Sequence, residues 1–314
     1  MAQSTVPAGP AAGATLRDRL QPTEVNATVR ATAWLLLIAN SAIIVTGALV
    51  RLTGSGLGCD NWPTCNGVTI APAADAGIHG AIEFGNRLLG VVLFIICLVA
   101  ITAVWRLRRT RKDLFWLPIV LTLVVPVQAV IGGISVHMEL NPWIVAAHFV
   151  PSAVCVALSA YLVLRTHDAG GPTEPVGTAL LRGLQWAIGI LTALTVVLGV
   201  LVTGAGPHAG DAISARNGLP MVIIARMHAF PVWLLVIATV WGLVLSTRLG
   251  LVAVRRALWV MLAAEVVQGL IGYLQYFLGV PVALVALHIV GLCFVIAAAT
   301  AVTDSAYRRA PLPR

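Results

Sequence analysis

The chain has 314 residues, of which 59% are hydrophobic and only 10% are charged. A soluble domain usually carries about 25% charged residues, and disordered chains combine low hydrophobicity with high charge, so both classes are excluded. The formal net charge of +8 could indicate a nucleic-acid partner, and the placement of the basic residues decides that question. Because a helical span needs ~20 apolar residues, the chain has room for about eight spans.

The apolar runs follow a polar N-terminal segment. Residues 1–30 are rich in Ala, Pro, Thr and Gly and lack an apolar core, which predicts a disordered tail and no cleavable signal peptide. Eight runs typical of membrane helices then cover residues 31–51, 82–105, 114–136, 143–165, 180–203, 221–245, 254–277 and 280–303. The sequence therefore predicts an all-α integral membrane protein.

The basic residues predict the orientation of these spans. If the N-terminus lies inside, 16 of the 20 Lys and Arg residues fall on the inner side, and only Arg51, Arg87, Arg216 and Arg226 fall outside. This positive-inside bias predicts a multi-pass protein of the inner or plasma membrane with both termini cytoplasmic. The charge is thus explained by topology, so we expect contact with membrane lipid and no nucleic-acid partner.

The second half of the chain repeats the first. When the run 268–288 is laid on 128–148 without gaps, six positions of the first half (Gln128, Ile131, Gly132, Val145, Ala146 and His148) recur as Gln268, Ile271, Gly272, Val285, Ala286 and His288. The segments 53–56 and 82–86 of the first half similarly correspond to 203–206 and 224–228 of the second. Four spans per unit predict two pseudo-symmetric four-helix bundles that run in the same direction, a parallel repeat.

The repeat divides the chain into five predicted parts. They are a disordered cytoplasmic tail at 1–30, an N-terminal four-helix bundle at 31–165 with an outer cysteine loop at 52–81, a cytoplasmic linker at 166–182, a C-terminal four-helix bundle at 183–303, and a cytoplasmic tail at 304–314.

Three histidines lie inside spans, towards the outer side: His148, His228 and His288. They could be interfacial side chains, each satisfied by a backbone carbonyl. However, ionisable groups inside spans are costly and indicate function, and these three occupy matching places in the repeat. Two imidazoles on facing helices can ligate an iron porphyrin from both faces, so His228 and His288 predict a haem site.

The first half breaks this symmetry. Asn86 occupies the position that answers His228, which leaves His148 as the one imidazole there. Glu83 lies three residues before Asn86, on the same helix face. It could form an ion pair with Arg87 or Arg51. Alternatively, its polar group could take part in a reaction beside a porphyrin that is bound through one axial ligand.

Cys59 and Cys65 lie in the first outer loop, on the oxidising side of the membrane. The five residues between them allow a disulfide. The spacing leaves open whether such a bridge is static or redox-active.

Taken together, these residues resemble the haem A synthase family of membrane enzymes, over about residues 31–303. The resemblance rests on R-L-T-G-S-G-L-G-C at 51–59, E-F-G-N-R at 83–87, G-G-I-S-V at 132–136, L-N-P-W-I-V-A-A-H at 140–148, R-M-H-A at 226–229 and the Gln and His of 268–288. It implies an oxidoreductase that acts on a CH3 group and converts haem O into haem A for terminal oxidases. It also implies haem O synthase and an unidentified electron acceptor as partners.

The resemblance further implies roles for particular residues. His228 and His288 would be the axial ligands of haem b, His148 would bind the iron of the substrate haem O, and Glu83 would be the catalytic carboxylate. Cys59 and Cys65 match the family's loop disulfide. Two successive hydroxylations with water-derived oxygen would give a geminal diol that loses water, with Glu83 as proton acceptor or as stabiliser of positive charge at the methyl carbon.

One departure from the family pattern affects the substrate site. The usual E-x-x-H is here E-F-G-N, so Asn86 replaces an expected histidine. We therefore predict a substrate iron that is five-coordinate through His148, or completed by water or Asn86.

Other functions stay open on the sequence. A bis-histidine membrane cytochrome that passes electrons without substrate chemistry would need the same histidines but not Glu83. A transporter is favoured in general by repeats, although the polar residues here lie towards one face. A thiol-oxidising protein that uses Cys59 and Cys65 would leave the repeated histidines unexplained.

Overall fold

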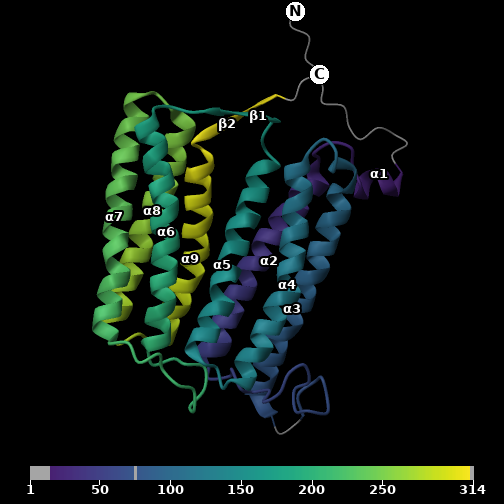
Figure 1. Cartoon of the computed structure of the whole chain (residues 1–314), viewed down its shortest axis with the longest axis vertical. Helices are drawn as coiled ribbons and strands as arrows, with labels where there is room; N and C mark the ends of the chain where they lie inside the picture. Colours follow the sequence, from purple (N-terminus) through teal and green to yellow (C-terminus); the bar gives the residue numbers. More distant parts are fainter. Residues whose placement is uncertain (1–14, 74–75, 312–314) are drawn as a thin grey trace, which may run out of the picture.

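The structure is a computed structural model that describes residues 15–73 and 76–311 (Figure 1). A short helix α1, Leu16–Leu20, precedes eight long helices. In chain order these are α2 (Ala27–Leu52), α3 (Gly77–Val104, continued by a 3-10 turn at Trp105–Leu107), α4 (Lys112–His137), α5 (Pro142–Arg165), α6 (Ala179–Ala205), α7 (Met221–Arg248), α8 (Val252–Phe277) and α9 (Val282–Asp304).

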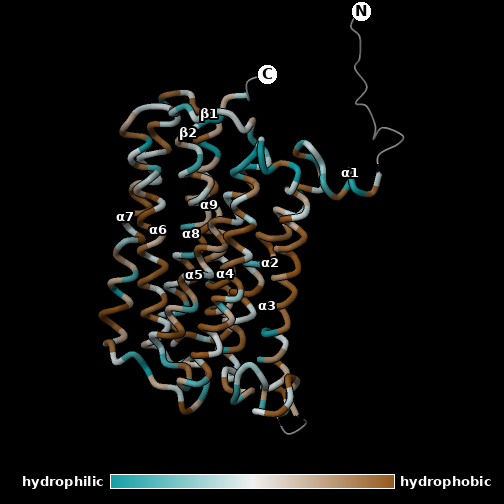
Figure 2. The backbone as a smooth tube through the Cα atoms, turned by 45° about the vertical axis from the view of Figure 1, so that its right-hand side comes forward, coloured by the Kyte–Doolittle hydropathy of each residue, from teal (hydrophilic) through white to brown (hydrophobic). Residues whose placement is uncertain are grey.

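The predicted eight spans are confirmed within the described residues. All eight long helices have the length and apolar composition needed to cross a membrane, and Figure 2 shows that their middle parts are the hydrophobic ones. Each observed helix contains most of its predicted run, and the ends differ by five residues at most. The chain is therefore an all-α, multi-pass membrane protein.

The predicted N-terminal tail differs from the structure in the part that is described. Residues 16–20 form α1, which Thr15 caps by accepting a hydrogen bond from the backbone N–H of Asp18 at 3.3 Å. Helix α2 begins at Ala27, because Asn26 caps it by accepting from the N–H of Val29 at 3.1 Å. Residues 1–14 of the predicted tail lie outside the described residues.

The long helices pack as two sets of four. Helix α2 contacts α3 and α5, and α4 contacts α3 and α5; likewise α6 contacts α7 and α9, and α8 contacts α7 and α9. The sets meet through α2, α5, α6 and α9 (Figure 1). A buried apolar cluster lies at this junction and contains Ile44, Val156, Val196 and Ile296. Apolar packing therefore joins the two sets as well as each set internally.

Two hairpins at the same end of the molecule use the same turn. Between α4 and α5, Leu140 has a φ of +58° and its N–H donates to the carbonyl of Ser135 at 2.7 Å. Between α8 and α9, Val280 has a φ of +55° and donates to Gln275 at 2.6 Å. A left-handed conformation is uncommon for any residue other than glycine. Its recurrence at the equivalent place in the second half supports the predicted repeat.

The opposite end of the bundle carries a two-stranded sheet that the sequence pattern does not predict. Strand β1 (Gly170–Pro175), in the predicted linker, pairs antiparallel with β2 (Tyr307–Pro311), in the predicted tail. Beneath it, Arg165 of α5 donates to both carboxylate oxygens of Asp304 of α9 at 2.6 Å. Polar contacts therefore join the two sets at this end.

Candidate functional site

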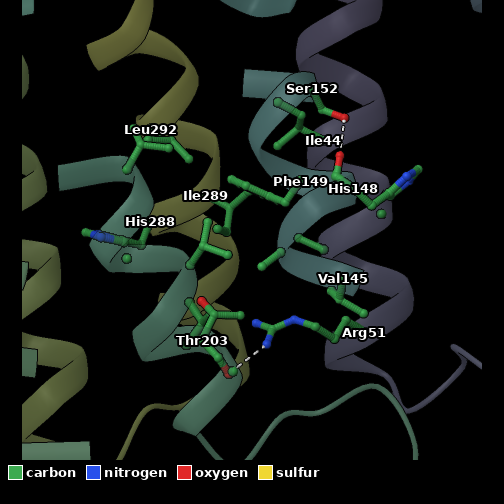
Figure 3. Close-up of a pocket in the computed structure, with 18 of the residues that line it drawn as sticks. Ile44, Arg51, Val145, His148, Phe149, Ser152, Thr203, His288, Ile289 and Leu292 are labelled. Carbon is green, nitrogen blue, oxygen red and sulfur yellow. Dashed lines mark hydrogen bonds between the residues drawn. The ribbon is translucent and has the colours of Figure 1, made fainter. Parts of the chain in front are cut away.

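A large cavity of about 1590 Å³ opens between the helices of both sets. It is lined by the three predicted histidines, His148, His228 and His288, and by Glu83 and Asn86. Figure 3 shows that His148 and His288 point in opposite directions, with Phe149 and Ile289 between them. Phe149 and Ile289 therefore divide the cavity into two compartments, one beside His148 and one beside His288. We call these the first-half and second-half compartments.

In the second-half compartment, His228 of α7 and His288 of α9 face each other. Their ring centroids are 6.4 Å apart and their planes are inclined at 75°. Two imidazoles that bind one metal ion through bonds of about 2 Å have centroids roughly 6 Å apart. Among the described residues, no three His, Cys, Asp or Glu side chains gather as a metal site. The pair therefore suits a metal ion that brings its equatorial ligands with it, as in a porphyrin.

Hydrogen bonds hold the imidazole of His228 and the backbone at His288. Nδ1 of His228 lies 2.9 Å from the carbonyl oxygen of Thr195. Since a carbonyl only accepts, Nδ1 carries the proton and Nε2 is free to bind a metal. Gln268 of α8 donates to the carbonyl of His288 at 2.8 Å, which fixes the backbone of α9 at this level. Nδ1 of His288 is buried without a partner in the described part of the chain.

Glycines on the preceding helices make room for the rings. A Cβ at Gly199 of α6 would lie 3.0 Å from Cε1 of His228, and one at Gly132 of α4 would lie 3.2 Å from Cε1 of His148. For Gly272 of α8 the distance to Cε1 of His288 is 3.5 Å. Each imidazole therefore lies on a glycine cradle, and a side chain there would occupy the space beside it.

The first-half compartment contains the imidazole of His148 and the carboxamide of Asn86. Gln128 donates to the carbonyl of His148 at 2.6 Å, as Gln268 does for His288. On α3, Oδ1 of Asn86 accepts a hydrogen bond from the hydroxyl of Thr46 at 2.8 Å. The oxygen is the atom through which an amide would bind a metal, so Thr46 competes for it. This contact favours His148 over Asn86 as a metal ligand in this compartment.

Glu83 is buried, with 5% of its surface exposed, and its carboxylate is fully engaged. Arg87, one turn later, donates to Oε1 at 2.5 Å, and the N–H of Cys59 donates to Oε2 at 2.7 Å. Of the two ion-pair alternatives, the structure shows the one with Arg87. Arg51 instead donates to the carbonyls of His208 at 2.7 Å and Thr203 at 3.3 Å, as Figure 3 shows for Thr203.

The outer cysteine loop covers the first-half compartment. Cys59 and Cys65 form a disulfide with a Cα–Cα distance of 4.4 Å. Trp62, between them, lies directly on α4, where a Cβ at Gly133 would overlap its indole. The guanidinium of Arg87 donates to the carbonyl of Asn61 at 3.0 Å. The loop is therefore held by the same arginine that pairs with Glu83.

Sequence reasoning missed one carboxyl group of this cavity. Glu265 of α8 lines it and is 3% exposed. The signal was present in the sequence, because a carboxyl group in the middle of a predicted span is costly and indicates function. It was overlooked because the repeat directed attention to residues that the two halves share, and the first half has Val125 at the matching position.

Comparison with known proteins gives a consistent family. Residues 30–300 match the family model described as cytochrome oxidase assembly protein, COX15-CtaA. The chain is 33% identical over 173 residues to a protein named "Heme A synthase" from Listeria monocytogenes, covering 54% of this chain and 56% of that protein. It is 31% identical over 146 residues to one of the same name from Geobacillus thermodenitrificans, covering 46% and 45%.

A third relative of that name, from Staphylococcus epidermidis, is 30% identical over 178 residues, which cover 54% of this chain and 58% of the relative. The chain thus spans about half the length of the curated relatives it matches. The family match, by contrast, covers most of the described helices, from α2 into α9. The chain therefore belongs to the COX15-CtaA family of cytochrome oxidase assembly proteins.

Proposed function

We propose that this protein is a haem A synthase, which oxidises a methyl substituent of haem O to a formyl group. The observation that carries the proposal is the pair of unequal compartments in one cavity. One offers two imidazoles 6.4 Å apart, and the other offers a single imidazole, His148, and an ion-paired carboxylate, Glu83. A passive electron carrier would need no such carboxylate.

The second-half compartment fits haem b. His228 and His288 would be its axial ligands, and the apolar walls, the glycine cradles and the free Nε2 of His228 suit a flat macrocycle between α7 and α9. When bound there, haem b supplies one-electron redox chemistry. The protein's part is to orient the imidazole of His228 through Thr195 and to hold the backbone at His288 through Gln268.

The first-half compartment is the proposed site of the substrate, haem O. His148 would bind its iron, and the hydroxyl of Thr46 donates to Oδ1 of Asn86, which lines the cavity. This assignment gives the one hydroxyl proton of Thr46 to Asn86 at 2.8 Å and not to the carbonyl of Ala42 at 3.0 Å. The substrate iron is thus proposed to be five-coordinate, or completed by water.

The overall conversion balances with water as the oxygen source. A methyl group and two waters give a geminal diol, four protons and four electrons, and the diol then loses one water to leave the formyl group. Both oxygens of Glu83 already accept hydrogen bonds. This favours a role as a fixed negative charge that stabilises positive character at the methyl carbon over a role as a proton acceptor.

The remaining proposals concern partners and placement. Haem O synthase would supply the substrate, and an electron acceptor would remove the four electrons. We propose the plasma membrane as the location, with both termini cytoplasmic, because 16 of the 20 basic residues then lie inside. In that orientation both hairpin turns and the disulfide loop are extracytoplasmic.

The test is conversion of haem O by the purified protein, followed by mass spectrometry of the extracted haem and by optical spectra of the bound haems. The decisive variant is Glu83→Gln, which keeps an acceptor for the N–H of Cys59 but removes the charge. Loss of one electrostatic stabiliser costs about 100- to 1000-fold in rate. The matched control is Glu139→Gln in the exposed α4–α5 turn, which should retain full activity.

Retained conversion in Glu83→Gln would remove the catalytic role from this residue. A protein that binds haem b but never converts haem O would instead support the cytochrome alternative. A protein that takes up neither haem would refute the proposed function.

A further inference from the structure

Glu265 is an acidic side chain in the middle of a membrane span. It lies near the midpoint of helix α8, which runs from Val252 to Phe277. At a rise of about 1.5 Å per residue, roughly 18–20 Å of helix separates it from either end. Its side chain is buried, with 3% of its surface exposed, and lines the cavity that contains His228 and His288.

The carboxyl group has one partner and one vacant oxygen. The hydroxyl of Thr239 on α7 donates to Oε1 at 2.7 Å. Oε2 is buried and has no hydrogen-bond partner in the described part of the chain. Unlike Glu83, Glu265 forms no ion pair among those residues. A charged carboxylate without a counter-ion is costly at this depth. The protonation equilibrium of Glu265 therefore depends on the charge of its surroundings.

The ionisable groups that face the same compartment are few. Helix α8 packs against α7 and α9. On these three helices, the other ionisable residues that line the cavity are the predicted ligands His228 and His288, and Arg226, Tyr273 and Tyr276. Helix α9 also carries the buried thiol of Cys293, which is not among the lining residues. Of these, only Glu265 is a carboxyl group.

Glu265 lies deeper in the membrane span than the ligand pair, because its partner Thr239 follows His228 by 11 residues, about 16 Å along α7. It precedes Gln268 by three residues, so the two side chains share a helix face one turn apart. Gln268 is the residue that donates to the carbonyl of His288 at 2.8 Å. The first half, with its single imidazole, has Val125 at the position that answers Glu265. A carboxyl group is therefore present at this position only in the half of the chain that has two histidines.

We propose that Glu265 is a proton-holding residue for electron transfer through the second-half compartment. This rests on the proposed function, in which His228 and His288 bind haem b. When a one-electron reductant adds an electron to that site, Glu265 takes up one proton from the aqueous phase. When the electron leaves to a one-electron acceptor, Glu265 releases the proton, so the net charge of the buried compartment stays constant.

The physical reason is the low dielectric of the site. An added electron and a charged carboxylate repel each other strongly where water is excluded, so electron and proton equilibria become coupled. The substrate reaction as proposed releases four electrons and four protons. A proton-holding group beside the electron path would let the two travel together.

The test is a redox titration of the haem-loaded protein at several pH values, read by its optical spectrum. In the wild type, we expect the reduced-to-oxidised ratio at a fixed potential to change by up to about tenfold per pH unit, or about 59 mV for one electron, over the range in which Glu265 titrates. Glu265→Gln keeps an acceptor for Thr239 and removes the proton. It should leave a residual dependence of less than about twofold, from the remaining groups.

An infrared difference spectrum, reduced minus oxidised, supplies a second measurement. The wild type should show the carbonyl band of a protonated carboxylic acid, and Glu265→Gln should lose it. Glu139→Gln, the exposed control, should retain both the band and the pH dependence. Thr239→Val removes only the hydrogen bond, so it should also retain the pH dependence, with a shifted midpoint pH.

The outcomes separate the inference from the function on which it rests. If haem b binds but the wild type has no pH dependence, or if Glu265→Gln leaves the dependence and the band unchanged, the inference is wrong and the proposed function stands. If Thr239→Val abolishes the dependence as fully as Glu265→Gln, the hydrogen bond is responsible and the inference is wrong. If the wild type binds no haem, both fail. Should Glu265→Gln not fold, the wild-type slope and infrared band still decide.

Discussion

The glycine beside His228 offers a sharp test of the two-histidine compartment. In Gly199→Ala, the new Cβ would lie 3.0 Å from Cε1 and 3.3 Å from Nδ1 of that ring. An ordinary contact begins at 3.4 Å, so the imidazole has to move by about 0.4 Å, or the two helices have to separate. Because Nδ1 is held by the carbonyl of Thr195 at 2.9 Å, the ring cannot move without straining that hydrogen bond.

The expected loss of haem affinity follows from overpacking beside a ligand, because a metal–nitrogen bond is too short to let the imidazole move away from the iron. An overpacked core site loses typically about 1–3 kcal/mol, and each 1.4 kcal/mol is tenfold in affinity, so haem b should bind about 5- to 140-fold more weakly. Alanine also favours the helix over glycine by about 0.5–1 kcal/mol. This gain offsets part of the overpacking cost in the folded protein.

The assay is transfer of haem from the purified protein to an excess of a haem-binding acceptor, followed by optical spectroscopy. Gly272→Ala is the matched control, because its Cβ would meet Cε1 of His288 at 3.5 Å, an ordinary contact. Its affinity should stay within about threefold of wild type. Equal affinities for wild type and Gly199→Ala, or a larger loss in the control, would refute the assignment of this geometry to the ligand pair.

Three further predictions concern other parts of the molecule. Asn86→His should add a second axial ligand in the first-half compartment and convert the loaded substrate haem from high spin to low spin, as measured by optical and paramagnetic resonance spectra. Reduction of Cys59–Cys65 should lower the melting temperature, because a loop of this length contributes about 2 kcal/mol. Asp304→Ala leaves Arg165 as a buried charge with one acidic partner fewer, and should destabilise the protein by about 3 kcal/mol in denaturant unfolding.

Each of these predictions has a control. For Asn86→His, an unchanged spin state in the loaded protein would contradict the five-coordinate assignment. The effect of reductant should disappear when both loop cysteines are replaced by serine. Glu174→Gln breaks the exposed pair with Arg308, whose side chains are 52% and 75% exposed, and exposed pairs contribute about 0–1 kcal/mol. A comparable loss in this variant would refute the claim that burial makes the Asp304 contact strong.

Much of the fold was predictable because a membrane imposes a simple rule on the chain. Every span must be apolar over about 20 residues, so hydropathy alone locates the eight helices. The ends were less predictable, since they depend on local caps. Asn26 and Thr178, which cap α2 and α6, extend these helices beyond the apolar runs. The β1–β2 pairing was not predictable, because its strands are short and polar and lie far apart along the chain.

The candidate site was predictable where polar residues interrupt apolar runs. His148, His228, His288 and Glu83 all line the cavity that the structure contains. Their spatial relation required the tertiary structure. Spacing along the chain could place His228 and His288 at similar depth, but not 6.4 Å apart.

The order of residues along the chain is enough to specify which segments cross the membrane, how the chain repeats and which side chains are candidates for chemistry. These properties follow from composition and period, which act locally. Only the folded chain establishes that Glu83 pairs with Arg87 and not with Arg51, that Thr46 holds the oxygen of Asn86, and that Glu265 lines the cavity and contacts Thr239. Such contacts depend on how helices rotate and pack against one another, and no property of a single helix specifies that.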